Sequence, residues 1–157
     1  MISENLKTII ENSDNIVFFG GAGVSTESNI PDFRSASGIY SSKSKYTYAP
    51  ETILSHSFFY SHTNEFYDFY NSKMIYKNAL PNTAHFALAK LEEMGKLKAV
   101  ITQNIDGLHQ VAGSKNVLEL HGSIHINYCT KCHEAYDLDY IVKSSDGIPN
   151  ALPVMEL

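Results

Sequence analysis

Apolar residues recur along this chain with two different spacings, which predicts a protein built from both helices and strands. They fall at helical spacing within residues 3–13, and a short apolar run then extends from Asn15 to Phe19. The run has the length of one strand, and a glycine-rich turn follows it. This region therefore predicts a strand, a turn and a helix that opens at Ser25-Thr26.

A second helix and two further strands are predicted in the middle of the chain. A Pro-Asn-Thr sequence is typical of a helix start, with either Asn82 or Thr83 as the cap, and Gly95 is placed to end that helix. Residues 97–101 and 117–120 are apolar runs of strand length. Strands that alternate with helices predict an α/β fold with a parallel, doubly wound sheet, in which ligands bind beyond the carboxyl ends of the strands.

Two stretches between the predicted strands differ in composition from the rest. Residues 35–50 are rich in Ser, Tyr and Lys and predict a mobile loop. Aromatic residues then crowd together from Ser57 to about Tyr76, which predicts a helical region. Four of these aromatic residues would share one helical face: Phe59, Phe66, Phe69 and Tyr70.

Composition and charge exclude several classes of protein. The chain has 157 residues, of which 43% are hydrophobic and 18% charged, as in an ordinary soluble globular protein. Its formal net charge of −5 gives no electrostatic reason to expect nucleic-acid binding, which usually needs a basic face. No apolar run approaches the ~20 residues that span a bilayer, and no secretory signal is visible. We therefore expect a cytoplasmic protein without a membrane partner.

The glycine-rich turn at residues 20–26 is a candidate phosphate site. Such a turn lets backbone N–H groups approach phosphates closely, although the Rossmann fingerprint would require a further glycine where Thr26 stands. On this motif alone, a nucleotide site and a tight structural turn remain open alternatives. In the following segment, residues 30–34, Phe33 offers a flat apolar face and Arg34 a charge that can fork onto phosphate. The alternative is that Phe33 belongs to the core and Arg34 is solvated.

A second polar segment, residues 102–109, leaves a predicted buried strand. Gln103 and Asn104 offer amide donors and acceptors, and Asp106 could hold a carboxamide or a ribose. The alternative is a loop in which Asn104 and Asp106 bond only to local backbone. His121 directly follows the next strand, where a histidine is either a packed core residue or a general base.

The chain contains two cysteines, Cys129 and Cys132, in a C-x-x-C spacing. In a reducing compartment this spacing indicates metal ligation or redox chemistry before a structural disulfide. A thiol oxidoreductase is disfavoured because the pair lies in a predicted hairpin instead of opening a helix. Residues 124–146 therefore predict a small lobe with a cysteine hairpin.

Five motifs, in this order and spacing, resemble the sirtuins, which are NAD-dependent protein deacylases. They are the glycine loop, Asn-Ile-Pro-Asp-Phe-Arg, Thr-Gln-Asn-Ile-Asp-Gly-Leu-His, Leu-His-Gly and the C-x-x-C pair. The resemblance extends from about residue 5 to Pro149, and the Pro-Asn-Thr-Ala-His sequence at residues 81–85 is similar to bacterial members. It implies a Rossmann-like parallel sheet, here only its N-terminal half, with a helical insertion and a small zinc-ribbon-like lobe. The implied boundaries are 1–123 for the NAD-binding part, with the insertion at about 35–80, then 124–149 for a partial zinc lobe.

The resemblance also implies a role for individual residues. His121 would be the general base, and Asn104 would help to order the site where nicotinamide is released. Cys129 and Cys132 would supply half of a four-cysteine zinc site. Acetyl-lysine proteins or peptides would be the substrates, with nicotinamide and O-acetyl-ADP-ribose as products. The residues implied to contact NAD, which is consumed as a co-substrate, are Ala22, Thr26, Phe33, Arg34, Gln103, Ile105, Asp106 and His121.

The sequence departs from the sirtuins after Pro149. Where relatives usually read Lys-Cys-Pro-x-Cys-x-Gly, residues 150–157 read Asn-Ala-Leu-Pro-Val-Met-Glu-Leu. Deleting one A from codons for the family sequence reproduces Asn-Ala-Leu-Pro-Val-Met, so we predict an out-of-frame tail. A trimmed or divergent tail is the alternative.

We therefore expect an N-terminal deacetylase fragment that is inactive or nearly so. The alternative function is a non-catalytic module that binds NAD or ADP-ribose. A redox dehydrogenase would need the missing third glycine and an acidic residue after the second strand, and the sequence has neither.

Overall fold

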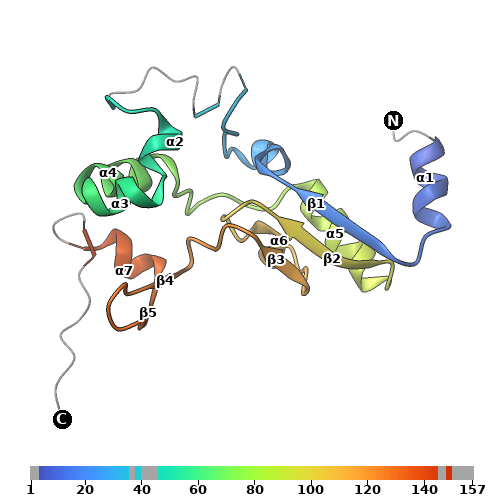
Figure 1. The fold of residues 1–157 in the computed structure, drawn as a ribbon. Coiled ribbons are helices and arrows are strands. Elements are labelled where there is room, and N and C mark those ends of the chain that lie inside the picture. Colours follow the sequence, from blue (N-terminus) through green and yellow to red (C-terminus); the bar gives the residue numbers. More distant parts are fainter. Residues whose placement is uncertain (1–3, 36–37, 40–45, 145–147, 150–157) are drawn as a thin grey trace, which may run out of the picture. The chain divides into compact units, whose positions relative to one another are not determined.

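A computed structural model describes four stretches of the chain: residues 4–35, 38–39, 46–144 and 148–149. The chain divides into two compact units, Met1–Asp32 with Lys77–Gly122 (unit 1) and Phe33–Tyr76 with Ser123–Leu157 (unit 2). The parallel sheet belongs to unit 1, whereas a group of short helices and a two-stranded hairpin belong to unit 2 (Figure 1). Within the described stretches, no helix is long and apolar enough to cross a membrane.

Unit 1 is built on a three-stranded parallel sheet with the strand order β1-β2-β3. This confirms the predicted parallel α/β sheet. In the register, Phe19 pairs with Ile101, which pairs with Leu118, and Gly20 pairs with Thr102 at the carboxyl end. The segments that follow the strands therefore leave the sheet at one edge. The strands are β1 (Ile16–Gly20), β2 (Leu97–Thr102) and β3 (Val117–Glu119).

Two helices of unit 1, α1 and α5, lie where the sequence predicts, whereas the short helix α6 was not predicted. Asn82 is the cap of α5: its side chain accepts a hydrogen bond from the Ala84 N–H at 2.9 Å, while the His85 ring accepts one from the Asn82 N–H at 3.2 Å. Gly95, at φ +73°, follows the end of the helix. The α-helices that the structure describes in unit 1 are α1 (Glu4–Glu11), α5 (Thr83–Glu93) and α6 (Leu108–Val111).

The helix after the glycine turn differs from the prediction. The sequence predicts a helix that opens at Ser25-Thr26, whereas the structure has a 3₁₀ helix, η1, that starts earlier and spans Ala22–Ser28. Asn29, in the left-handed conformation at φ 62°, ends it. Pro31 then stands where a longer helix would have to continue, and proline disfavours a helical residue before it.

The two faces of the sheet are covered differently. On one face, Val100 has no exposed surface, and the ring of Phe18 lies 6.1 Å from that of His109 in α6. On the other face, Phe19 is 61% exposed and Leu118 50% exposed. Parallel sheets are normally covered on both faces. The described residues of this chain thus leave one apolar face of the sheet open.

Unit 2 has a core of aliphatic and aromatic side chains that comes from the segment before and within its helices. Its buried cluster contains Ile39, Ile53, Phe58 and Phe69. The elements are α2 (Pro50–Ile53), α3 (His56–Ser61), α4 (Thr63–Lys73), β4 (Ile126–Tyr128), β5 (Ala135–Asp137) and α7 (Leu138–Val142). β4 and β5 form the predicted antiparallel hairpin around the cysteines.

The predicted single aromatic face is split between two helices. Phe59 lies in α3 and contacts Phe66 of α4 edge-on, with ring centroids 4.9 Å apart. His62, at φ −138°, separates the two helices, so the prediction of one continuous face was wrong. Most of the loop predicted at 35–50 and the whole tail at 150–157 lie outside the described residues.

Candidate functional site

The segments that follow the three strands are joined by backbone hydrogen bonds at the carboxyl edge of the sheet. The Gln103 N–H donates to the Gly20 carbonyl at 3.0 Å, and the Leu120 N–H donates to the Thr102 carbonyl at 2.9 Å. A Cβ at Gly21 would lie 3.1 Å from Oε1 of Gln103, so the absence of a side chain at Gly21 lets the two loops approach closely. Ligands of parallel sheets bind at this edge.

A buried polar network connects the glycine turn with the segment after β2. Ser25 has no exposed surface, and its hydroxyl donates to Oδ2 of Asp106 at 2.7 Å. The same hydroxyl oxygen accepts a hydrogen bond from Nδ2 of Asn104 at 3.0 Å. The other carboxylate oxygen of Asp106 accepts the Leu108 N–H at 2.9 Å. The network therefore fixes both loops. Asp106 makes a long-range hydrogen bond to Ser25 and also the local backbone bond that was expected if this segment were only a structural loop.

Ser25 is a site residue that the sequence analysis missed as a candidate. Its only sequence signal was its place in the glycine turn, where it was interpreted as a residue that opens a helix. The partner of its hydroxyl lies 81 positions away, at Asp106.

His121 is held by the backbone of the neighbouring loop. Its Nδ1 lies 3.1 Å from the Gln103 carbonyl oxygen, and the side chain is exposed. A carbonyl oxygen only accepts hydrogen bonds, so Nδ1 is the donor, and in the neutral ring the lone pair is then on Nε2. The geometry thus equips Nε2 of His121 to accept a proton.

The other predicted NAD-contacting residues are divided between the two units. Ala22 is half-buried at the start of η1, and the exposed Thr26 donates its hydroxyl to the Gly23 carbonyl at 2.9 Å. In unit 2, Phe33 packs partly buried against the aromatic core, while Arg34 is exposed. The candidates that the structure brings together at one edge of unit 1 are Gln103, Asn104, Asp106 and His121.

The start of η1 has the features of a phosphate cradle. Gly21, which has no side chain to cap the helix, occupies the N-cap position. A Cβ at Gly23 would meet nothing within 4 Å, so the space beside this turn is open. Uncapped N–H groups at the start of a helix bind phosphate oxygens readily. The turn therefore has the backbone features of a phosphate-binding turn.

Two buried histidines near the site were also missed. The rings of His85 and His109 lie 4.7 Å apart between centroids and are 0% and 1% exposed. Neither nitrogen of His109 has a hydrogen-bond partner among the described residues. Burial lowers the pKa of both side chains, and the neighbouring His85 lowers the pKa of His109 further, while Asp106 opposes the shift. Both rings are therefore held neutral.

This pair should make the stability of unit 1 depend on pH. Because the folded pKa values lie below the ordinary 6.5, the unfolded chain binds more protons once the pH falls below that value. The free energy of unfolding should decrease from about pH 6.5 downward and be unaffected by the pair above it. Urea unfolding at a series of pH values checks this. His109→Leu should weaken the pH dependence, whereas His125→Gln, at an exposed position, should retain it. An unchanged slope in H109L would contradict the assignment.

The cysteine hairpin holds its sulfur atoms in a tight turn. The Lys131 N–H donates to Sγ of Cys129 at 3.4 Å, and the His133 N–H donates to the Cys129 carbonyl at 3.0 Å. Hydrogen bonds from the backbone of Cys132 and then of Lys131 lower the pKa of the Cys129 thiol. Throughout the described stretches, however, no group of three or more His, Cys, Asp or Glu side chains could hold a metal ion. The residues present do not fit a complete zinc site.

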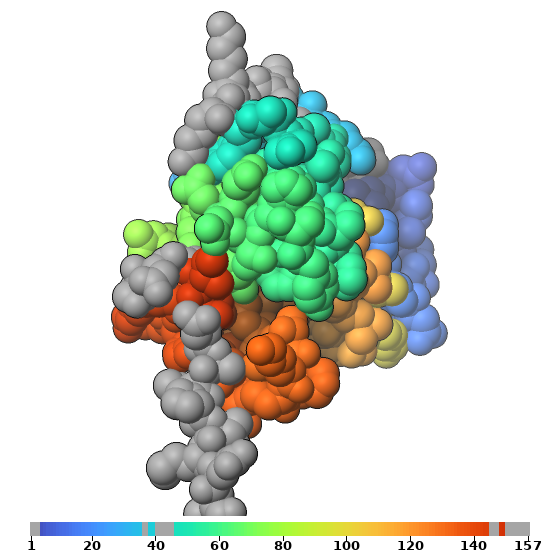
Figure 2. Space-filling model, turned by 60° about the vertical axis from the view of Figure 1, so that its left-hand side comes forward, coloured from blue at the N-terminus to red at the C-terminus, as the bar shows by residue number. Residues whose placement is uncertain are grey.

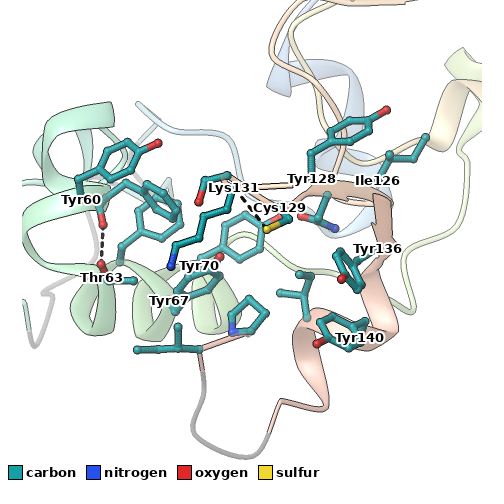
Figure 3. Close-up of a pocket in the computed structure, with 17 residues that line it drawn as sticks. Tyr60, Thr63, Tyr67, Tyr70, Ile126, Tyr128, Cys129, Lys131, Tyr136 and Tyr140 are labelled. Atoms are coloured by element: carbon teal, nitrogen blue, oxygen red, sulfur yellow. Dashed lines mark hydrogen bonds between the residues drawn. The ribbon is translucent and has the colours of Figure 1, made fainter. Parts of the chain in front are cut away.

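A cavity of about 780 Å³ lies beside this hairpin within unit 2. Aromatic side chains of α3 and α4 form one side of it, and the hairpin with Cys129 and Lys131 forms another (Figure 3). The same hollow separates the green helices from the orange hairpin in the space-filling view (Figure 2). Burial, and then the neighbouring Tyr67, raise the pKa of Tyr70 in the cavity wall to about 12.

Comparison with known proteins gives one consistent result. The sequence pattern of the Sir2 family matches residues 21–150. An NAD-dependent protein deacetylase of Clostridium tetani is 65% identical over 146 residues, which cover 93% of this chain and 59% of that protein. One of Cutibacterium acnes is 50% identical and is matched over 95% of this chain and 61% of its own length.

Solved structures agree with this result. A Sir2 variant with a deacetylated p53 peptide and 3'-O-acetyl ADP ribose has a TM-score of 0.83 and 45% identity, over 93% of this chain and 58% of that one. The parallel sheet of unit 1 is thus Rossmann-like. The chain spans about three fifths of the length of these curated relatives. Because the family pattern covers most of the chain, the protein belongs to the Sir2 family.

Proposed function

We propose that this chain carries the NAD-binding and catalytic residues of an NAD-dependent protein lysine deacetylase. The observation that carries the proposal is the hydrogen-bonded set at the edge of the sheet, in which Ser25 joins Asn104 to Asp106 and the Gln103 carbonyl orients His121. The names of the relatives support the reaction class. The whole protein would remove acetyl groups from lysine and release nicotinamide and O-acetyl-ADP-ribose.

The residues would bind NAD through different parts of the molecule. The turn that contains Ala22 and Thr26 would receive the diphosphate, and Arg34 would add a positive charge that suits the same group. Phe33 would cover the reacting sugar carbon, and Gln103 would contact the nicotinamide ribose. Ile105 and Asp106 would line the nicotinamide pocket, beside Asn104.

In the proposed reaction, the acetyl oxygen of the substrate attacks the anomeric carbon of NAD and nicotinamide departs. Nε2 of His121 then accepts a proton from a ribose hydroxyl, whose oxygen attacks the former amide carbon. One water molecule then adds to that carbon and its bond to the lysine nitrogen breaks, which frees lysine and leaves the acetyl group on the ribose oxygen. Proton acceptance by a positioned base contributes about 10²–10⁴-fold to such reactions. The Ser25–Asn104–Asp106 network would contribute by holding the loops in the reactive geometry.

We further propose that residues 1–157 by themselves have little or no activity. The open apolar face around Phe19 and Leu118 supports this, because parallel sheets are normally covered on both faces. Cys129 and Cys132 are only half of a zinc site. Without the other half, a zinc-ribbon-like lobe around residues 124–149 would lack the metal that stabilises it.

A chimera tests the proposed function. Residues 1–149 are joined to the part of the Clostridium tetani deacetylase that lies beyond its match with this chain. The chimera should release nicotinamide only when both NAD and an acetyl-lysine peptide are present, with mass spectrometry following the peptide. The 157-residue chain should release little under the same conditions. A folded chimera that binds ADP-ribose yet releases no nicotinamide would instead support a binding module and overturn the proposal.

A further inference from the structure

The cavity of unit 2 lies between two aromatic walls. On the side of α3 and α4, the Phe66 ring stacks on the Tyr70 ring at 5.8 Å between centroids and meets the Tyr67 ring edge-on at 5.4 Å. On the side of the hairpin and α7, the rings of Tyr136 and Tyr140 stack at 4.4 Å. Figure 3 shows both groups of rings around the same hollow. Ring faces and edges of this kind favour a flat aromatic guest.

The cavity has the size and the lining of a site for a small molecule. Its volume of about 780 Å³ lies within the ~300–1,000 Å³ that is typical of small-ligand sites. Such sites are mostly apolar and carry a few polar groups that fix the orientation of the ligand. Tyr60, 59% exposed, and Tyr128, 65% exposed, border the cavity, so a ligand can enter it from solvent.

The lining carries one positive charge. Lys131 is the single charged side chain among the described residues that line the cavity, and no acidic residue is among them. Its side chain extends from the hairpin towards the side chains of α4 (Figure 3). The contact with Sγ of Cys129 is made by the backbone N–H of Lys131 and not by its ammonium group. Within the described stretches, the ammonium group has no ion-pair partner.

Two phenol groups on the wall add neutral hydrogen-bond donors. Burial raises the pKa of Tyr67, and burial and then Tyr67 raise the pKa of Tyr70 to about 12. Both phenols therefore stay protonated and leave the positive charge of Lys131 uncompensated. Neither hydroxyl has a hydrogen-bond partner in the part of the chain that the structure describes. An anion in the cavity would thus meet an ammonium group and two neutral donors on its walls.

We propose that this cavity binds a small aromatic carboxylate. The ring system of the ligand lies between the two walls of aromatic side chains, and its carboxylate pairs with the ammonium group of Lys131. An aliphatic acid would lose the ring contacts, and an aromatic amine would be repelled by Lys131. The two features together therefore select a ligand with both a ring and a negative charge. The proposal concerns unit 2 alone and does not depend on the deacetylase activity.

Calorimetric titration of the purified 157-residue chain with 2-naphthoate tests the proposal. We expect one site per chain, with naphthoate bound about tenfold or more tightly than two matched probes. One probe, 2-naphthylmethylammonium, has the same rings and the opposite charge, and the other, cyclohexanecarboxylate, has the charge without an aromatic ring. Bound naphthoate should slow hydrogen exchange in residues 59–70 and 126–141. Similar affinity for all three probes, or protection in other segments, would contradict the proposal.

Matched variants at two lysines locate the charge that recognises the ligand. Lys131→Gln should weaken naphthoate binding about tenfold, the usual effect of losing one hydrogen bond to a charged group, whereas Lys131→Arg should retain it. Lys143→Gln removes the same charge from an exposed lysine of α7 that does not line the cavity, and should bind like the original chain. Unchanged affinity in K131Q would overturn the proposal.

The chimera with the Clostridium tetani deacetylase separates a ligand site from a docking place for later residues. Naphthoate should bind to the chimera as it does to the 157-residue chain. Loss of binding in a chimera that unfolds cooperatively would show that residues beyond position 149 fill the cavity. That result would refute the ligand site and leave the assignments in unit 1 untouched.

Discussion

Replacing His121 by alanine in the chimera should lower kcat for deacetylation by about 10²–10⁴-fold, the usual contribution of a positioned general base. The physical reason is the hydrogen bond from Nδ1 to the Gln103 carbonyl, which orients the ring and, in its neutral form, leaves Nε2 as the nitrogen with the lone pair. Alanine removes the proton acceptor but leaves the backbone of both loops unchanged. The KM for NAD should therefore change much less than kcat.

Steady-state measurement of nicotinamide release, with NAD and acetyl-lysine peptide varied separately, checks this result. His125→Ala provides the control, because His125 is another exposed histidine of the same chain and lies outside the proposed site. Retention of kcat in the H121A chimera would show that another group accepts the proton. It would leave the assignment of NAD binding to the glycine turn untouched.

Replacing Phe69 by alanine should destabilise unit 2 by about 3–5 kcal/mol, the usual cost of truncating a buried phenylalanine. Phe69 is 1% exposed, packs with Ile53 and Phe58, and contacts the Tyr46 ring edge-on at 5.2 Å between centroids. The loss is a large fraction of the ~5–15 kcal/mol that stabilises a typical domain. Unit 2 should therefore open far more often in this variant.

Hydrogen exchange measured by mass spectrometry is the suitable readout, because it reports on α3 and α4 separately from the sheet of unit 1. Faster exchange in F69A should be concentrated in residues 56–73. Tyr60→Ala is the matched control: Tyr60 lies on α3 but is 59% exposed, so its truncation should have a small effect. Equal protection of these helices in both variants would contradict the assignment of Phe69 to the core.

Features that depend on neighbouring residues could be predicted from the sequence. The cap of α5 required an asparagine before the first turn, and the end of that helix required a residue such as Gly95 that adopts a positive φ at low cost. The cysteine hairpin and the parallel strands followed from short apolar runs and turn residues. The caps and turns are decided by residues a few positions apart, and each strand was located by its own local apolar run.

The aromatic region shows where periodicity was insufficient. Spacing alone placed Phe59 and Phe66 on one helix, but His62 interrupts the helix between them. The aromatic rings still pack together, because burial of their surface does not require one continuous helix. The high density of aromatic residues predicted that they would pack together. The break between α3 and α4 decided how their rings are arranged.

The sequence by itself determined the family, the parallel α/β class and most of the residues at the carboxyl edge of the sheet. Only the tertiary structure decided that Ser25 binds Asp106, that His85 and His109 are buried together, and that one face of the sheet is left open by the described residues. The physical reason is distance along the chain. Turns and caps are short-range interactions that leave a local pattern, whereas burial and hydrogen bonds between remote segments exist only once the strands have paired.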